Sequence, residues 1–221
     1  MAISVVIPVH NNWNLTHSLL LDIYRHLPQD TEVIVVDDCS TDEAVGSGLS
    51  WWGRTILSGR LTICTNPENV GFLTSCNLGV SNADTDVVIL MNNDIKLKDD
   101  HIVEKVRSAL RSTHPTLVGA RMLVHDTGWN TFGGKIFPYL EGWFLAFHKK
   151  DWDNFGGFDT RYIPYDYEDV DLSTTYLHSG GEIVPINVDI VHLGGQSIKF
   201  SPERAAQTEK NKEKFRLKWL S

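Results

Sequence analysis

The chain opens with an apolar run, ISVVIPV over residues 3–9, which ends in the polar residues His10 and Asn11. A second run, EVIVV over residues 32–36, ends in the same way, in DDCSTD over residues 37–42. A short apolar run without polar alternation is typical of a strand buried on both faces. Such strands occur mainly in parallel sheets that helices cover on both sides. The two runs therefore predict buried strands of a parallel sheet, each followed by polar residues.

Helix and strand patterns alternate along the rest of the chain. Leucine or isoleucine recurs every fourth residue from Leu15 to Leu27, which places these side chains on one helix face, and Pro28 ends that helix. Further strands are predicted over Leu61–Thr65, Asp86–Met91, Leu117–Val124, Trp143–Phe147 and Glu182–Pro185. Further helices are predicted over Phe72–Ser81, Asp99–Arg111, Glu168–His178 and Pro202–Trp219. This alternation predicts an α/β protein with a mainly parallel central sheet flanked by helices.

The composition excludes several classes of protein. The 221 residues carry 28 acidic and 20 basic side chains, a net charge of −8, whereas proteins that bind nucleic acid rely on Lys and Arg. No apolar run approaches the roughly 18 residues that span a bilayer, and residues 1–9 lack the basic residue of a secretory signal. Cys39, Cys64 and Cys76 have no metal-like spacing, which predicts reduced thiols. We therefore expect a cytoplasmic protein without a transmembrane segment and without nucleic acid as a partner.

Polar side chains gather where three predicted strands end. His10–Asn12 follow the first strand, Asp37–Asp42 the second, and Asn92–Asp94 the strand that ends at Met91. Each loop alone could be a turn or a helix cap, because Asp, Asn and Ser favour both. Three such loops together favour a ligand site, since ligands of open α/β sheets bind beyond the carboxyl ends of the strands. Residues 8–13 contain no glycine, which excludes a P-loop or a dinucleotide-binding turn and favours a metal ion as the phosphate ligand.

Seven motifs resemble those of inverting glycosyltransferases of family 2, in the family's order. They are SVVIPVHN at 4–11, VIVVDDCSTD at 33–42, NPENVGF at 66–72, LMNND at 90–94, GGFD at 156–159, YEDVDL at 167–172 and VHLGG at 191–195. Each motif is weak alone, but seven in order are specific. The Asn-Asn-Asp and Glu-Asp-Val-Asp forms are most similar to the rhamnosyltransferase-like branch of that family.

The resemblance implies the GT-A fold of nucleotide-diphospho-sugar transferases, in a single domain over residues 1–221. Residues 1–98 would bind the nucleotide sugar, residues 99–200 would bind the acceptor and hold the catalytic groups, and residues 201–221 would form a C-terminal helix. The implied enzyme is a hexosyl- or deoxyhexosyltransferase, metal-dependent and inverting. It would move a sugar from a nucleotide-diphosphate donor to a hydroxyl of a glycan, a glycoprotein or a lipid-linked saccharide. A partner outside this chain could contribute to the choice of acceptor.

The resemblance also assigns the donor and metal sites. Asp94 is the last residue of the family's DxD position and would bind a divalent cation, with His192 completing the metal shell. Carboxylate oxygens suit both Mg²⁺ and Mn²⁺, and imidazole suits Mn²⁺ better. Asp38 would accept hydrogen bonds from the base or the ribose. The residues implied to bind the donor are Pro8, His10, Asn11, Asp38, Asn69, Gly71, Asn92 and Asn93.

Two adjacent carboxylates are the candidate catalytic groups. Asp169 is the second residue of the family's Glu-Asp pair, which implies that it is the catalytic base. Glu168 would bind an acceptor hydroxyl or orient the site, because adjacent helical side chains point about 100° apart. Acidic residues are also common in the first turn of a helix, where the helix dipole favours them. That explanation suffices for Asp166 and Asp171, but it does not explain the surrounding pattern.

Other readings of the sequence remain open at this stage. A GT-A module could bind a nucleotide sugar or a glycan without turning it over. A nucleotidyltransferase normally needs a Gly- and Arg-rich loop after the first strand, and a processive synthase needs QxxRW and transmembrane segments; neither pattern is present. Trp143 is a candidate acceptor contact, and the basic helix 202–219 is either solvated or in peripheral contact with a membrane. Residues 40–60 and 124–142 are expected to be loops that select the substrate.

Overall fold

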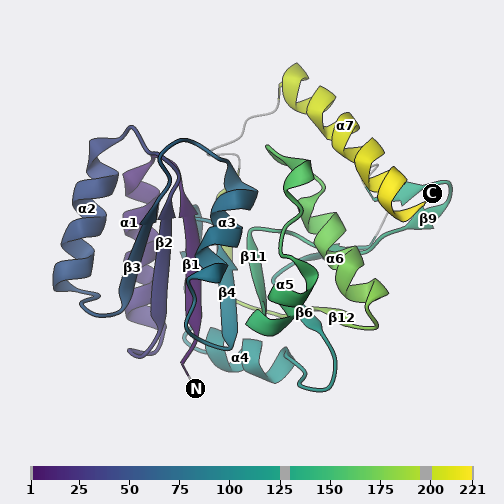
Figure 1. The fold of residues 1–221 in the computed structure, drawn as a ribbon. Helices are drawn as coiled ribbons and strands as arrows, with labels where there is room; N and C mark the ends of the chain where they lie inside the picture. Colours follow the sequence, from purple (N-terminus) through teal and green to yellow (C-terminus); the bar gives the residue numbers. More distant parts are fainter. Residues whose placement is uncertain (1, 125–129, 195–200, 221) are drawn as a thin grey trace.

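The computed structural model describes residues 2–124, 130–194 and 201–220. Its centre is a seven-stranded sheet in the order β12-β6-β11-β4-β1-β2-β3 (Figure 1). The strands are β1 (Ser4–Val9), β2 (Glu32–Asp37), β3 (Leu61–Thr65), β4 (Val87–Met91), β6 (Thr116–Gly119), β11 (Phe144–His148) and β12 (Glu182–Pro185). Strand β11 runs antiparallel to both of its neighbours, and the other pairs in this sheet are parallel. The predicted α/β class with a mainly parallel central sheet is confirmed.

Helices cover both faces of this sheet (Figure 1). They are α1 (Trp13–His26), α2 (Glu43–Thr55), α3 (Phe72–Ser81), α4 (Ile102–Ala109), α5 (Lys149–Phe155), α6 (Glu168–His178) and α7 (Pro202–Trp219), with a short 3₁₀ helix at Thr160–Tyr162. Three small antiparallel pairs complete the fold: β5 (Ile95–Leu97) with β13 (Ile190–His192), β7 (Met122–Leu123) with β10 (Tyr139–Leu140), and β8 (Thr131–Phe132) with β9 (Lys135–Ile136).

The inner strands are mostly apolar because each face of the sheet has its own core, whereas the edge strands β3 and β12 are only partly buried. On β1, Val5 and Ile7 point to the face covered by α1, α2 and α4, whereas Val6 points to the face covered by α3, α5 and α6. Successive side chains of a strand point to opposite faces. Because both faces of an inner strand are buried, polar residues cannot occupy every second position in it. Helix α7 joins the second core through Phe215, which is fully buried.

One predicted loop and one predicted strand differ from the structure. The segment expected as a loop over residues 40–60 contains α2, whose residue Trp52 packs in the core. The three glycines within α2 lower its helix propensity, which is why the sequence did not indicate a helix. The strand predicted over Leu117–Val124 is two strands, β6 and β7, since the chain leaves the main sheet after Gly119 and pairs with β10. Among the helices that the structure describes, none combines the length and apolarity needed to cross a membrane.

Candidate active site

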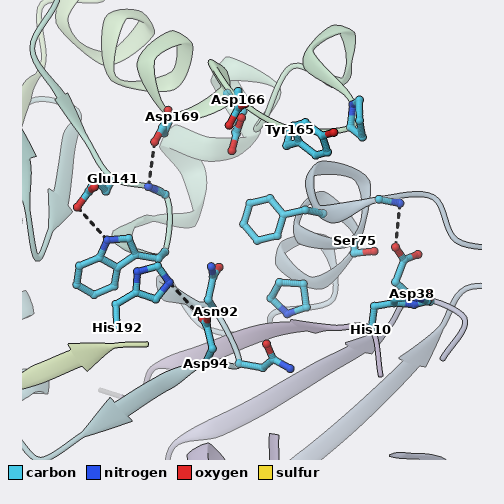
Figure 2. Close-up of a pocket in the computed structure, with 18 of the residues that line it drawn as sticks. His10, Asp38, Ser75, Asn92, Asp94, Glu141, Tyr165, Asp166, Asp169 and His192 are labelled. Carbon is cyan, nitrogen blue, oxygen red and sulfur yellow. Dashed lines mark hydrogen bonds and ion pairs between the residues drawn. The ribbon is translucent and has the colours of Figure 1, made fainter. Parts of the chain in front are cut away.

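A pocket of about 720 Å³ lies beyond the carboxyl ends of β1, β2 and β4 (Figure 2). All of the residues implied to bind donor or metal or to act in catalysis line it, except Asn11. Gly195, the last residue of the seventh motif, lies outside the described residues. The structure therefore brings together side chains from strand ends that are far apart in the sequence.

Asp38 organises the end of the pocket next to β1 and β2, where the sequence predicts the nucleotide. It is 4% exposed, and its Oδ1 accepts hydrogen bonds from Asn66 Nδ2 and from the backbone N–H of Val70, both at 2.9 Å. Its Oδ2 accepts the N–H of Gly71 at 2.8 Å. These bonds use most of the accepting capacity of the carboxylate. Asp38 therefore fixes the 66–71 loop against β2, and little of it remains to contact a nucleotide.

Asn11 lies behind the pocket and ties two loops together. Its side-chain Oδ1 accepts from the backbone N–H groups of Thr41 and Asp42, at 2.8 and 3.0 Å, and its own N–H donates to Ser40 Oγ at 2.7 Å. Its φ of 59° is left-handed, a conformation that Asn adopts more readily than most residues. Asn11 thus holds the ends of β1 and β2 together, while the exposed ring of His10 lines the pocket.

His192 and Asp94 meet through the pairing of β13 with β5. The register sets His192 opposite Ile95, and the N–H of Leu193 donates to the carbonyl of Asp94 at 3.0 Å. As a result, His192 Nε2 lies 3.2 Å from Asp94 Oδ1 (Figure 2). The ring of Trp143 stacks on the His192 imidazole, with centroids 4.9 Å apart and planes 15° apart.

The oxygen and nitrogen atoms around Asp94 and His192 suit a divalent cation. Asp94 Oδ1 is buried and has no contact with a described residue other than the His192 imidazole, and buried Asn92 Oδ1 has no hydrogen-bond partner among the described residues. Unsatisfied buried oxygens of this kind are unusual and point to an absent ligand. No cluster of three or more His, Cys, Asp or Glu side chains that could hold a metal is found in the described part of the chain. Mg²⁺ and Mn²⁺ sites commonly use one or two protein ligands and complete the shell with substrate phosphates, so the residues fit.

Glu168 and Asp169 begin α6 on the opposite wall of the pocket. Asp169 Oδ2 accepts the N–H of Gly142 at 3.3 Å, and Oδ1 accepts the N–H of Val170 at 2.8 Å. Glu168 Oε2 is buried and has no hydrogen-bond partner in the part of the chain that the structure describes. Burial raises the pKa of both carboxyls above the usual range, and the negative charge of Asp169 raises the pKa of Glu168 further. A carboxylate with a raised pKa is a stronger base, which is what proton abstraction near neutral pH requires.

The pocket holds functional candidates that the sequence pattern did not single out. Glu141 precedes β11 and accepts from Trp143 Nε1 at 3.1 Å, and Tyr165 and Asp166 lie on the loop before α6 (Figure 2). Arg204 reaches the pocket from α7 and binds the Asp166 carboxylate, at 2.8 Å from Nη2 and 3.2 Å from Nε. Only the spatial approach of α7 reveals Arg204, because in the sequence it is one of six basic residues on a polar helix.

The charges of the pocket constrain its ligand. Its lining contains six carboxylates, and within the described residues Arg204 is the only Lys or Arg side chain that faces them. The six are Asp38, Asp94, Glu141, Asp166, Glu168 and Asp169. A phosphate-bearing ligand would meet repulsion here unless a cation accompanied it. The pocket therefore favours a ligand that is bound together with a metal ion, or one that is neutral.

Comparison with known proteins agrees with this geometry. The family model described as Glycosyl transferase family 2 matches residues 4–166. None of the curated proteins compared with the chain matches it. Among solved structures, the chain is similar to the mannosyltransferase PcManGT from Pyrobaculum calidifontis, in complex with GDP-Man and Mn²⁺, at 22% identity and a TM-score of 0.69. That alignment covers 84% of this chain and 54% of PcManGT.

Two further structures share the fold. GalNAc-T7 with UDP, GalNAc and Mn²⁺ is 15% identical, with a TM-score of 0.72 over 97% of this chain and 50% of that one. TarS 1–349 of S. aureus is 18% identical, with a TM-score of 0.66 over 98% of this chain and 66% of that one. The chain thus spans between about half and two thirds of the length of these structures.

Proposed function

The chain belongs to glycosyl transferase family 2 and has the GT-A fold, and on this basis we propose that it catalyses metal-dependent, inverting sugar transfer. The donor would be a nucleotide-diphosphate sugar, and the acceptor a hydroxyl of a glycan or glycoconjugate. The observation that carries the proposal is that the Asp94–His192 pair and the Glu168–Asp169 pair line one pocket, and Figure 2 shows Asp94, His192 and Asp169 around it.

Asp94 and His192 would hold the cation, with Asn92 as a further oxygen donor. When bound, such a cation stabilises the negative charge that develops on the departing diphosphate. Because the pocket lining has an excess of carboxylates, the protein alone offers the diphosphate little positive charge. Imidazole in the donor set favours Mn²⁺ over Mg²⁺.

Asp169 would act as the base. Its carboxylate removes the proton from the acceptor hydroxyl as that oxygen forms a bond to the anomeric carbon. The bond from the anomeric carbon to the diphosphate oxygen breaks in the same step, and the nucleoside diphosphate leaves with its electron pair. Attack from the face opposite the leaving group inverts the anomeric configuration. General-base assistance of this kind contributes about 10²–10⁴-fold to the rate.

The donor end would recognise the nucleotide through its fixed loops. Pro8, His10, Asn69 and Gly71 line that end, and Asp38 holds the loop that carries Asn69 and Gly71 in place. A preformed loop binds a ligand without the loss of conformational freedom that ordering it would require. We place the base and ribose of the donor here, with the diphosphate directed toward Asp94.

A thermal-shift screen tests the proposal. UDP, GDP, dTDP and their sugars, dTDP-rhamnose included, are each added with and without Mn²⁺. A ligand at 100 times its Kd stabilises the folded protein by about 2.7 kcal/mol, which raises the Tm measurably. Because the pocket lining is acidic, we expect a true donor to produce this rise only when Mn²⁺ is present. The best donor is then incubated with candidate acceptors and the products are resolved by mass spectrometry. Binding without transfer or donor hydrolysis would identify a binding module, and no shift with any nucleotide would reject the proposal.

A further inference from the structure

The loop before α6 has a backbone that its own sequence does not favour. Asp166 and Tyr167 have φ angles of 72° and 80°, in the left-handed region, and neither is a glycine. For a bulky residue such as tyrosine this conformation is unusual, and it persists only where the surroundings impose it. Glu168 and Asp169 follow directly, so whatever holds this loop also sets the position of both carboxylates.

Residues 204–211 of α7 supply these surroundings. Asn211 is fully buried, and its side-chain amide donates to three carbonyl oxygens of the preceding segment: those of Tyr162 and Tyr165 at 2.7 Å and that of Asp166 at 3.0 Å. One amide group thus spans the whole approach to α6. A buried donor that satisfies several carbonyls is expensive to remove, because each carbonyl then loses its partner.

The same stretch of α7, residues 204–211, also binds the loop through the Asp166 carboxylate. Arg204 binds both of its oxygens, and Thr208 Oγ1 donates to Oδ2 at 2.6 Å. The carboxylate is 6% exposed, so these are largely desolvated, charge-assisted bonds. Backbone and side chain of Asp166 are therefore both fixed by one helix that lies more than thirty residues further along the chain.

Residues 215–219 of α7 make a second set of contacts, to Tyr167 and to side chains outside the loop. Phe215 packs among the rings of Phe132, Phe137 and Tyr167, and Trp219 Nε1 donates to Asp171 Oδ1 at 2.7 Å. Helix α7 therefore has two sets of contacts, and the polar set made by Arg204, Thr208 and Asn211 is the one that bonds the backbone and carboxylate of Asp166. We expect the loss of one bond in this set to change the loop while Phe215 and Trp219 keep their contacts.

We propose that Arg204, Thr208 and Asn211 form a clamp that positions the Glu168–Asp169 pair for catalysis. They act through the loop and are positioning residues. This inference rests on the proposed function, and it adds that the catalytic geometry depends on a helix beyond the region that the family model matches. Small displacements of a reacting group are costly, since an error of about 1 Å can reduce a rate by about 10²-fold.

The test uses Thr208, which does not line the pocket. Thr208→Val keeps the shape of the side chain and removes the hydroxyl, whereas Thr208→Ser keeps the hydroxyl. We expect Thr208→Val to lower kcat about tenfold, with the donor KM unchanged, because the donor end is untouched. Thr208→Ser should restore most of the lost kcat. Equal loss in both variants, or a change in KM alone, would overturn the proposal.

Trp219→Phe is the matched control on the same helix. It removes the hydrogen bond to Asp171 and keeps the aromatic packing, so it should lower Tm at least as much as Thr208→Val and leave kcat unchanged. Hydrogen exchange of the free protein over residues 163–168, a window that leaves out Asp171, separates this test from that of the proposed function. Faster exchange in Thr208→Val than in Trp219→Phe supports the clamp, even if the wild type transfers no sugar. Equal exchange in the two variants overturns it.

Discussion

The two ends of the pocket are built on different principles. At the donor end, the polar side chains are satisfied within the protein: Asp38 accepts three hydrogen bonds and Asn11 spans two loops. At the proposed catalytic and metal-binding end, Asn92, Asp94 and Glu168 each keep a buried oxygen that forms no hydrogen bond with any described residue. The polar groups of the first end are hydrogen-bonded without a ligand, whereas those of the second have oxygens that a ligand could engage. Removing a polar group should therefore destabilise the fold at the donor end and mainly impair chemistry or ligand binding at the other.

The largest effect is expected at Asp169. Asp169→Asn keeps the size of the side chain and removes the base, so transfer should fall by about 10²–10⁴-fold while nucleotide binding in the presence of Mn²⁺ is kept. Turnover measured against calorimetric binding of the same donor separates the two. Near-normal turnover would exclude Asp169 as the base, and a parallel loss of binding would show that the two ends are not independent.

Next in size is the effect of Asp38 on folding. Asp38→Asn sets an amide N–H₂ group against the N–H donors of Val70 or Gly71, which should lower the free energy of unfolding by about 2 kcal/mol. Urea denaturation measures the change. Asp30→Asn, at an exposed position, is the matched control and should stay within about 0.5 kcal/mol of the wild type. If the two variants were equally stable, the donor end would not be the preformed region described above.

A smaller effect is expected at His192. His192→Phe keeps a ring that can stack on Trp143 and removes the nitrogen beside Asp94. Loss of a metal ligand should weaken Mn²⁺ binding in the presence of the nucleotide by about 10–100-fold, a range seen even for outer partners of metal ligands. The readout is quenching of tryptophan fluorescence by Mn²⁺. Unchanged quenching would assign the metal to other groups.

The smallest effect concerns Glu168 and depends on pH. Its raised pKa means that the folded protein holds a proton that the unfolded chain loses at lower pH, so the wild type loses stability as pH rises from the ordinary glutamate value to the raised one. Glu168→Gln has no such loss. It should match the wild type near pH 4 and exceed it by about 1 kcal/mol at pH 8, a figure reduced for the partial solvent access of the site. Greater stability of the wild type at pH 8 would contradict this.

Sequence patterns predict the parallel core well because burial on both faces leaves a plain signal. Runs such as residues 3–9 need no tertiary information to be read as buried strands. Helix α2 carries the opposite signal, since a glycine lowers helix propensity. At Gly48 the reason is tertiary: a Cβ atom there would lie 2.1 Å from the Trp13 ring. That close approach is invisible in the order of residues.

The candidate site likewise contains residues that the sequence indicates and residues that only the structure reveals. The resemblance placed Asp94, His192, Glu168 and Asp169 in one site, and the structure brings them to one pocket. Their catalytic and metal-binding roles stay predictions. Arg204 could not be predicted, because its place depends on how α7 packs through Phe215 and not on any motif around it. A residue that reaches the site only through tertiary packing cannot be recognised from the residues around it in the sequence.

Strand β11 has a consequence for how this protein can change over evolution. Because it runs against β4, the carboxyl end of β4 and the amino end of β11 lie at one edge, and the N–H of Asn92 donates to the carbonyl of Trp143 at 3.0 Å. The pairing of Phe144 with Met91 fixes this junction within the sheet itself. Because this junction is held within the sheet, changes in the segment between β6 and β11 are expected to leave the position of Asp94 largely unaltered. In the enzyme proposed above, that segment could diversify to suit different acceptors while the metal site is inherited unchanged.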